Sequence, residues 1–130
     1  MREYQSKYEK CLLCDIVEYE LSRSTKVVYE NREYVALLPH YAMWPYEIHV
    51  YPKKHVSSLR DVKHENLKYL ADILRVATAL YTELLERDAP YIMVFHNPPT
   101  RGDHSYYHFH VEFYQPYRDK EKLKYAAGIE

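Results

Sequence analysis

Short runs of β-branched and aromatic residues predict the strands of a sheet. Four runs of this kind follow one another: Val27–Glu30, Tyr34–Leu38, Glu47–Tyr51 and Tyr91–Phe95. Only Asn31-Arg32-Glu33 separates the first two runs, which is typical of a hairpin. The third run alternates between polar and apolar residues and stops at Pro52, which cannot donate a backbone hydrogen bond. An antiparallel sheet is therefore the expected framework.

One long helix is predicted between the third and fourth runs. Apolar residues repeat at helical spacing from Val62 to about Leu85. Ser58 or Asp61 is expected to cap the start of this helix, and Pro90 to end it.

Tyr106–Tyr114 is predicted as a strand with two different faces. Side chains alternate along a strand, so one face carries Tyr107, Phe109, Val111 and Phe113. The opposite face carries His108, His110, Glu112 and Tyr114. We expect the first face to join the core and the second to carry chemistry.

Length and composition fit one domain and exclude several classes of function. The 130 residues predict a single α+β domain, 1–130, with an antiparallel sheet and one long helix. The net charge of -1 gives no electrostatic reason to expect nucleic acid as a partner. No apolar run approaches the roughly 20 residues of a membrane span, and the N-terminus is too polar for a signal peptide, so a soluble, cytoplasmic protein is expected.

With only 2 glycines, Rossmann fingerprints and P-loops are excluded. Scarce Asn and Gln with abundant Lys and Glu suggest a heat-adapted, thermophile source.

Cys11 and Cys14 form a C-x-x-C pair that opens a segment expected to be helical to about Leu21. A redox dithiol would need a βαβ context, which the pattern lacks. A structural zinc ion would need two more nitrogen or sulfur ligands, for which His55 and His108 are the candidates. We expect zinc held by these four residues, and two unliganded buried cysteines are the alternative.

The alternating His108-x-His110-x-Glu112 aims three titratable groups at one surface. A neutral imidazole with an orienting neighbour can attack phosphorus or bind a metal ion. The alternative is a solvated strand face. Of the remaining histidines, His64 is expected at the surface of the long helix, and satisfied or exposed side chains are the default for His40 and His49.

Three segments carry motifs that belong together: Cys11-x-x-Cys14, Pro52-Lys53-Lys54-His55 and Ser105-Tyr106-Tyr107-His108-Phe109-His110-Val111-Glu112. As an ordered set they resemble the histidine-triad superfamily. The resemblance implies that His110 is the nucleophile that attacks a nucleotide α-phosphorus and that Ser105 contacts the phosphate. It implies that His108 is a zinc ligand together with the two cysteines and His55. Glu112 stands where the third histidine would be, so a standard hydrolase of the superfamily is not expected.

Further segments narrow the resemblance: Trp44-Pro45-Tyr46-Glu47, Phe95-His96-Asn97-Pro98-Pro99 and the stretch from Phe113 to Glu130. With them, residues 11–130 resemble the C-terminal half of the galactose-1-phosphate uridylyltransferase family. That half contacts the hexose phosphate across a dimer interface, which implies roles for a set of substrate-binding residues: Trp44, Asn97, Lys124, Gly128 and Glu130. It also holds a second metal, such as iron, in the region that matches His96, His108 and His110.

Two hypotheses of different class follow from the resemblance. In the first, the chain is a nucleotidyltransferase of the UDP-glucose:hexose-1-phosphate type that acts through a nucleotidyl-His110. In the second, it is a non-catalytic metal- and sugar-phosphate-binding half, because the family's catalytic His-Pro-His-x-Gln motif is absent here. This half would pair with a separate N-terminal half or form a homodimer. A nucleotide hydrolase or phosphorylase is a third alternative, which Glu112 disfavours.

Overall fold

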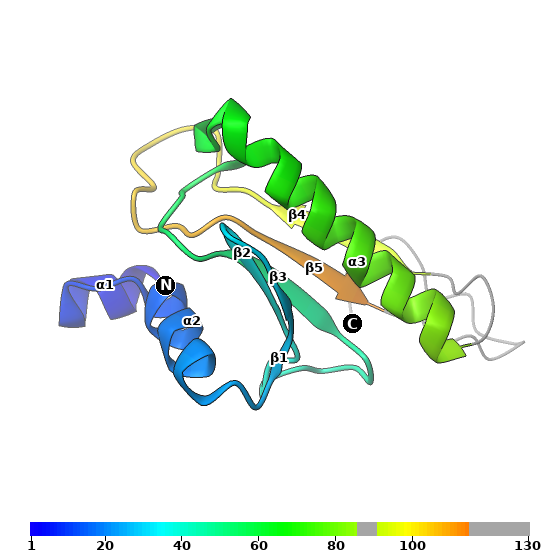
Figure 1. The fold of residues 1–130 in the computed structure, drawn as a ribbon. Coiled ribbons are helices and arrows are strands. Elements are labelled where there is room, and N and C mark those ends of the chain that lie inside the picture. Colours follow the sequence, from blue (N-terminus) through cyan, green and yellow to red (C-terminus); the bar gives the residue numbers. More distant parts are fainter. Residues whose placement is uncertain (86–90, 115–130) are drawn as a thin grey trace, which may run out of the picture.

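The computed structural model describes residues 1–85 and 91–114, which form an α+β fold (Figure 1). Within these ranges the elements follow in the order α1 (Arg2–Tyr8), α2 (Leu12–Arg23), β1 (Val27–Glu30), β2 (Tyr34–Leu37), β3 (Ile48–Pro52), the 3₁₀-helices η1 (Leu59–Asp61) and η2 (His64–Asn66), α3 (Leu67–Leu85), β4 (Ile92–His96) and β5 (His110–Tyr114). Among the described helices, none is both long enough and apolar enough to cross a membrane.

The described strands form one antiparallel sheet in the order β1-β2-β3-β5-β4. The predicted hairpin is confirmed and turns at Asn31, whose Oδ1 accepts hydrogen bonds from the backbone N–H groups of Glu33 (3.2 Å) and Tyr34 (3.0 Å). Such an Asx turn stabilises a tight connection between two strands. β3 lies between β2 and β5, which places His49 opposite Glu112.

Helices pack on both faces of the sheet (Figure 1). α3 covers one face, and the core between them contains Tyr34, Ala36, Ile48, Val50, Leu70, Ile73, Ala77, Tyr81, Phe109, Val111 and Phe113. α2 packs on the other face, over a smaller core of Leu13, Val17, Val35, Leu37 and Tyr51. Further along this second face, polar side chains of β3, β5 and β4 gather, and these form the site described below.

The two-faced pattern around β5 is confirmed, but its strand is shorter than expected. Phe109, Val111 and Phe113 are buried in the core. The ladder begins at His110 and not at Tyr106, because the backbone N–H of Phe109 donates to the Val56 carbonyl (2.8 Å) in the loop after β3. Tyr107 therefore leaves the core face, and its ring lies 6.1 Å from that of His110.

The long helix is described as far as Leu85, and its predicted end at Pro90 lies outside the described residues; it begins later than Ser58 or Asp61. The Ser58 hydroxyl donates to Asp61 Oδ2 (2.8 Å), and the Asp61 N–H donates to the Ser58 carbonyl (3.0 Å). Both residues are thus engaged within η1. A second short 3₁₀-helix follows before α3 begins at Leu67, and the exposed His64 lies in it.

Candidate functional site

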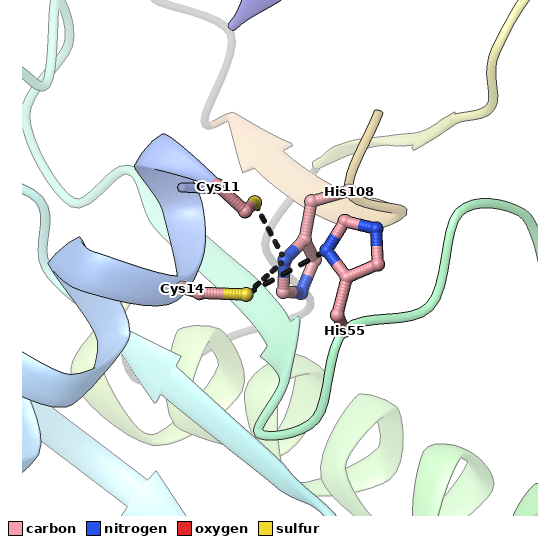
Figure 2. A group of neighbouring side chains, drawn as sticks. All are labelled: Cys11, Cys14, His55 and His108. Atoms are coloured by element: carbon pink, nitrogen blue, oxygen red, sulfur yellow. Dashed lines mark hydrogen bonds between the residues drawn. The ribbon is translucent and has the colours of Figure 1, made fainter. Parts of the chain in front are cut away.

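Cys11, Cys14, His55 and His108 come together at the end of α2, as the sequence predicted (Figure 2). Cys11 and Cys14 lie at the N-cap and in the first turn of α2, one helical turn apart. The Nδ1 atom of His108 lies 3.5 Å from the Cys11 sulfur and 3.4 Å from the Cys14 sulfur. The Nδ1 atom of His55 lies 3.6 Å from the Cys14 sulfur. These four donor atoms could hold one metal ion.

The spacing of these atoms is compatible with zinc. Tetrahedral ligands at the usual zinc–sulfur and zinc–nitrogen distances place each nitrogen about 3.6 Å from each sulfur. Both imidazoles turn Nδ1 inward and donate from Nε2–H to a backbone carbonyl, His55 to Ser105 (2.9 Å) and His108 to Pro52 (3.1 Å). Such outer partners fix the tautomer and the ring orientation of a metal ligand.

The electrostatics of the cluster favour a bound cation. Burial and the neighbouring Cys11 raise the pKa of the Cys14 thiol to about 12. A metal ion removes this cost, because it deprotonates a coordinating thiol outright. Burial lowers the pKa of His108 to about 4, so its imidazole is neutral at pH 7, which is the form that binds metal.

A second cluster consists of His96 at the end of β4 and His110 and Glu112 on β5. His96 and His110 are paired across the two strands, and their rings stack with centroids 4.6 Å apart. Glu112 lies between the nitrogens: Oε2 is 3.0 Å from His96 Nε2, and Oε1 is 3.3 Å from His110 Nε2. The sequence predicted His96 as part of a second metal site, and these three residues could hold an ion.

The tautomer of His110 follows from its backbone contact. Its Nδ1–H donates to the carbonyl of His108 (2.8 Å), so its Nε2 carries the lone pair. This lone pair is directed toward a carboxylate, which is favourable only when a proton or a metal ion lies between them. His96 Nε2 is likewise buried without hydrogen-bond geometry to any described residue.

Glu112 is ionised in this setting. Burial acts to raise its pKa, but the adjacent imidazoles of His110 and His96 and the hydroxyl of Tyr114 outweigh burial and hold the pKa well below its usual range. The Tyr114 hydroxyl donates to Glu112 Oε2. The cluster therefore offers a fixed negative charge next to two imidazoles.

The other predicted site residues lie outside both clusters. Ser105 is exposed and contacts the first cluster only through its carbonyl, which accepts from His55. Asn97 is exposed, and its Oδ1 accepts from the backbone N–H of Leu59 (2.9 Å). Trp44 is half-buried in the loop before β3. The predicted substrate-binding residues Lys124, Gly128 and Glu130 lie outside the described residues.

Two further polar residues lie on this face, Glu47 and His49, and the sequence did not predict their contact. Both side chains are buried, and His49 Nε2–H donates to Glu47 Oε1 (2.5 Å). His49 Nδ1 lies 2.8 Å from the Tyr51 hydroxyl. The signal was present, since Glu47-x-His49-x-Tyr51 alternates in the same way as His108-x-His110-x-Glu112.

Comparison with known proteins identifies the family of this chain. Residues 1–128 match the family described as galactose-1-phosphate uridyl transferase, C-terminal domain. The galactose-1-phosphate uridylyltransferase of Thermotoga maritima is 41% identical over 132 residues, which cover 100% of this chain and 41% of that protein. The Haemophilus influenzae enzyme of the same name is 37% identical, over 99% of this chain and 38% of that protein.

Solved structures give the same relationship. A uridylyltransferase structure superposes with a TM-score of 0.83 at 40% identity, covering 98% of this chain and 40% of that one. A HIT family hydrolase from Legionella pneumophila superposes with a TM-score of 0.58 at 28% identity, covering 80% and 90%. The histidine-triad-like fold is thus confirmed, and the chain spans about two fifths of the uridylyltransferases it matches. Since the family match extends over nearly every residue, this chain belongs to the galactose-1-phosphate uridylyltransferase family and corresponds to its C-terminal domain.

Proposed function

We propose that this chain is the metal- and sugar-phosphate-binding domain of a uridylyltransferase that moves a UMP group between a UDP-sugar and a hexose 1-phosphate. It works with an N-terminal half, on the same or another polypeptide, or with a second copy of itself. The convergence of His96, His110 and Glu112 on the polar face of the sheet carries this proposal, because the donor atoms of these three groups lie close enough together to hold one ion. The relatives named as uridylyltransferases supply the substrate class.

Two metal ions fit the donor atoms. Zinc suits the thiolate and imidazole ligands of Cys11, Cys14, His55 and His108. The second cluster offers two imidazoles and one carboxylate, a ligand type that iron accepts as readily as zinc. An ion there would supply positive charge near the phosphate groups. The residues of this chain would orient the sugar phosphate, with Ser105, Asn97 and Trp44 expected at its edge.

A second candidate role is covalent catalysis by His110, and the tautomer of this residue favours it. With Nδ1–H held by the His108 carbonyl, Nε2 has the lone pair that attack on phosphorus requires. In this step the Nε2–phosphorus bond forms and the bond from the α-phosphorus to the bridging oxygen breaks. Hexose 1-phosphate leaves with the bonding electrons, and a second hexose 1-phosphate then takes the UMP group.

Intact-mass measurement after incubation with UDP-glucose separates the two roles. The binding role predicts no adduct on this chain alone, whereas an N-terminal half added in trans becomes uridylylated. A UMP adduct on wild-type chain that is absent from His110→Ala would establish the covalent role instead. If radiolabelled UDP-glucose and galactose 1-phosphate both fail to bind the chain, with or without an N-terminal half, the substrate class is wrong.

A further inference from the structure

Polar side chains of β3 and of the loop before it are linked by hydrogen bonds, with Glu47, His49 and Tyr51 buried and Tyr41 exposed. If Nε2–H of His49 donates to Glu47, then Nδ1 is the acceptor and the Tyr51 hydroxyl donates to it (2.8 Å). The Tyr41 hydroxyl lies 2.7 Å from that of Tyr51 and donates to it in turn. The hydrogen bonds therefore run in one direction: Tyr41 donates to Tyr51, Tyr51 to His49, and His49 to Glu47.

At one end, this series of hydrogen bonds holds the loop that carries Trp44. The second oxygen of Glu47, Oε2, accepts hydrogen bonds from the backbone N–H groups of Met43 (3.0 Å) and Trp44 (3.1 Å). Glu47 thus receives three N–H donors, two from the loop and one from His49. The conformation of the loop depends on where the Glu47 carboxylate is held.

The two middle members of this series, Tyr51 and His49, meet the second cluster. His49 Nδ1 lies 3.6 Å from Glu112 Oε1, and the two residues are opposite each other in the β3–β5 ladder. The ring of Tyr51 stacks on that of His110, with centroids 5.6 Å apart and planes inclined by 27°. His49 therefore contacts both carboxylates, that of Glu47 and that of Glu112.

We propose that His49 is a positioning residue that, through Glu47, holds the loop carrying Trp44 at the edge of the His96/His110/Glu112 cluster, so that the loop and the cluster bind the same hexose phosphate. This inference deepens the proposed function and depends on its substrate class. Stability alone does not account for the arrangement, since well-packed apolar residues of similar volume are often as stabilising as a buried ionic pair.

Trp44 is the single tryptophan of the chain, so its fluorescence reports on this loop alone. Three substitutions distinguish the hydrogen bond at His49 Nε2 from the one at Nδ1. His49→Gln keeps an amide donor near the Nε2 position for Glu47, His49→Asn keeps only the polar atom near Nδ1, and His49→Leu removes both. His64→Asn is the matched control, because His64 is exposed in η2.

Acrylamide quenching of Trp44 in the full chain is the first measurement. We expect the quenching constant to rise about twofold in the Asn and Leu variants, because a loop that loses its anchor opens more often. It should remain at the wild-type value in the Gln variant and in the His64 control. Equal quenching in all variants would overturn the positioning role, and if the Leu variant does not fold, the Gln–Asn pair decides.

Binding of galactose 1-phosphate, followed through the protection of Trp44 from acrylamide, is the second measurement. The loss of one buried hydrogen bond predicts a dissociation constant about tenfold weaker in His49→Asn than in His49→Gln. Metal content and melting temperature should be the same in these two variants. A purely structural role would instead predict that affinity and melting temperature fall together. If galactose 1-phosphate and UDP-glucose bind but leave wild-type Trp44 unprotected, the shared site is overturned. If neither binds, with or without an N-terminal half, the proposed function fails, and the quenching series still decides the role of His49 in the loop.

Discussion

The Nδ1–H of His110 donates a hydrogen bond to the backbone carbonyl of His108, 2.8 Å away. His108 therefore serves both clusters, with its side chain among the cysteines and its carbonyl on His110. A substitution of the His108 side chain leaves that carbonyl in place. Mutations can consequently separate the two clusters, although their residues alternate along one short segment.

His108→Ala is expected to remove the metal from the Cys11/Cys14 cluster and to lower the melting temperature. The ligand is lost, and the buried side chain leaves a cavity, which together cost about 2–5 kcal/mol. His110→Ala should keep that metal and abolish ion binding at the second cluster, with a smaller loss of stability. Metal analysis by mass spectrometry and thermal melts of both variants check the prediction. Loss of all metal from both variants would show that the clusters are not independent.

Removal of the first metal should destabilise the wild-type chain strongly. A site that is filled at 1,000 times its dissociation constant contributes about 4 kcal/mol to the free energy of unfolding. Chelation should therefore lower the melting temperature of the wild-type chain and leave that of Cys14→Ser unchanged, because the variant has already lost the site. His64→Ala, at an exposed position, should behave as wild type. The idea of a structural metal fails if wild-type protein with one metal ion bound in this cluster melts at the same temperature with and without chelator.

Asn31→Ala should destabilise the β1–β2 hairpin and its contact with α3. The Asn31 amide donates to the Tyr69 carbonyl (2.8 Å) and to Asp72 Oδ2 (3.0 Å), and its oxygen accepts two backbone N–H groups. All four hydrogen-bonding positions of the side chain are used. Denaturant unfolding should show a loss of about 2 kcal/mol.

The neighbouring Arg32→Ala serves as the control for Asn31→Ala. Arg32 lies in the same turn, and its side chain is exposed and pairs only with Glu33 (3.5 Å). Its removal should change the free energy of unfolding by less than about 0.5 kcal/mol. Equal effects of the two substitutions would mean that Asn31 does not organise the turn.

The fold was predictable where one periodicity dominates a segment. The alternation around Val111 and the helical spacing of α3 predict most of the core correctly, although Tyr107, Leu67 and Leu84 stay outside it. The limits of the elements were less predictable. β5 starts late because Phe109 pairs with Val56, a residue far away in the sequence, and α3 starts late because Ser58 and Asp61 bond to each other. The Phe109–Val56 contact is tertiary and leaves no local pattern, whereas the Ser58–Asp61 pair is local and suits a 3₁₀ turn as well as a helix cap.

The candidate site was predictable where residue type already restricts the chemistry. Cysteine and histidine at metal-ligand spacing indicate one cluster even without coordinates, and the structure brings its four members together. His49 was expected to be satisfied or exposed, and the structure shows the first of these, since both ring nitrogens have partners. Its pairing with Glu47 and its position opposite Glu112 were not predicted, because the register between β3 and β5 cannot be derived from either strand alone.

The pH dependence of stability tests the charge states of the buried groups in metal-free protein. Burial lowers the pKa of His108 to about 4 and also lowers the pKa of His49. An unfolded histidine takes up its proton near pH 6.5. Between these values the unfolded chain binds protons that the folded chain does not, so stability falls as the solution becomes more acidic. Glu112, with its depressed pKa, acts in the same direction below about pH 4.3.

Chelated wild-type protein should therefore lose stability on acidification from pH 6.5 to pH 4, at up to about 1.4 kcal/mol per pH unit for His108 alone. His108→Leu should flatten this slope without abolishing it, because His49 continues to contribute. Glu112→Gln should keep the slope above pH 4.3 and flatten it below that value. Urea unfolding at half-unit pH intervals measures all three curves. A wild-type slope that His108→Leu leaves intact would show that folding does not lower the pKa of His108.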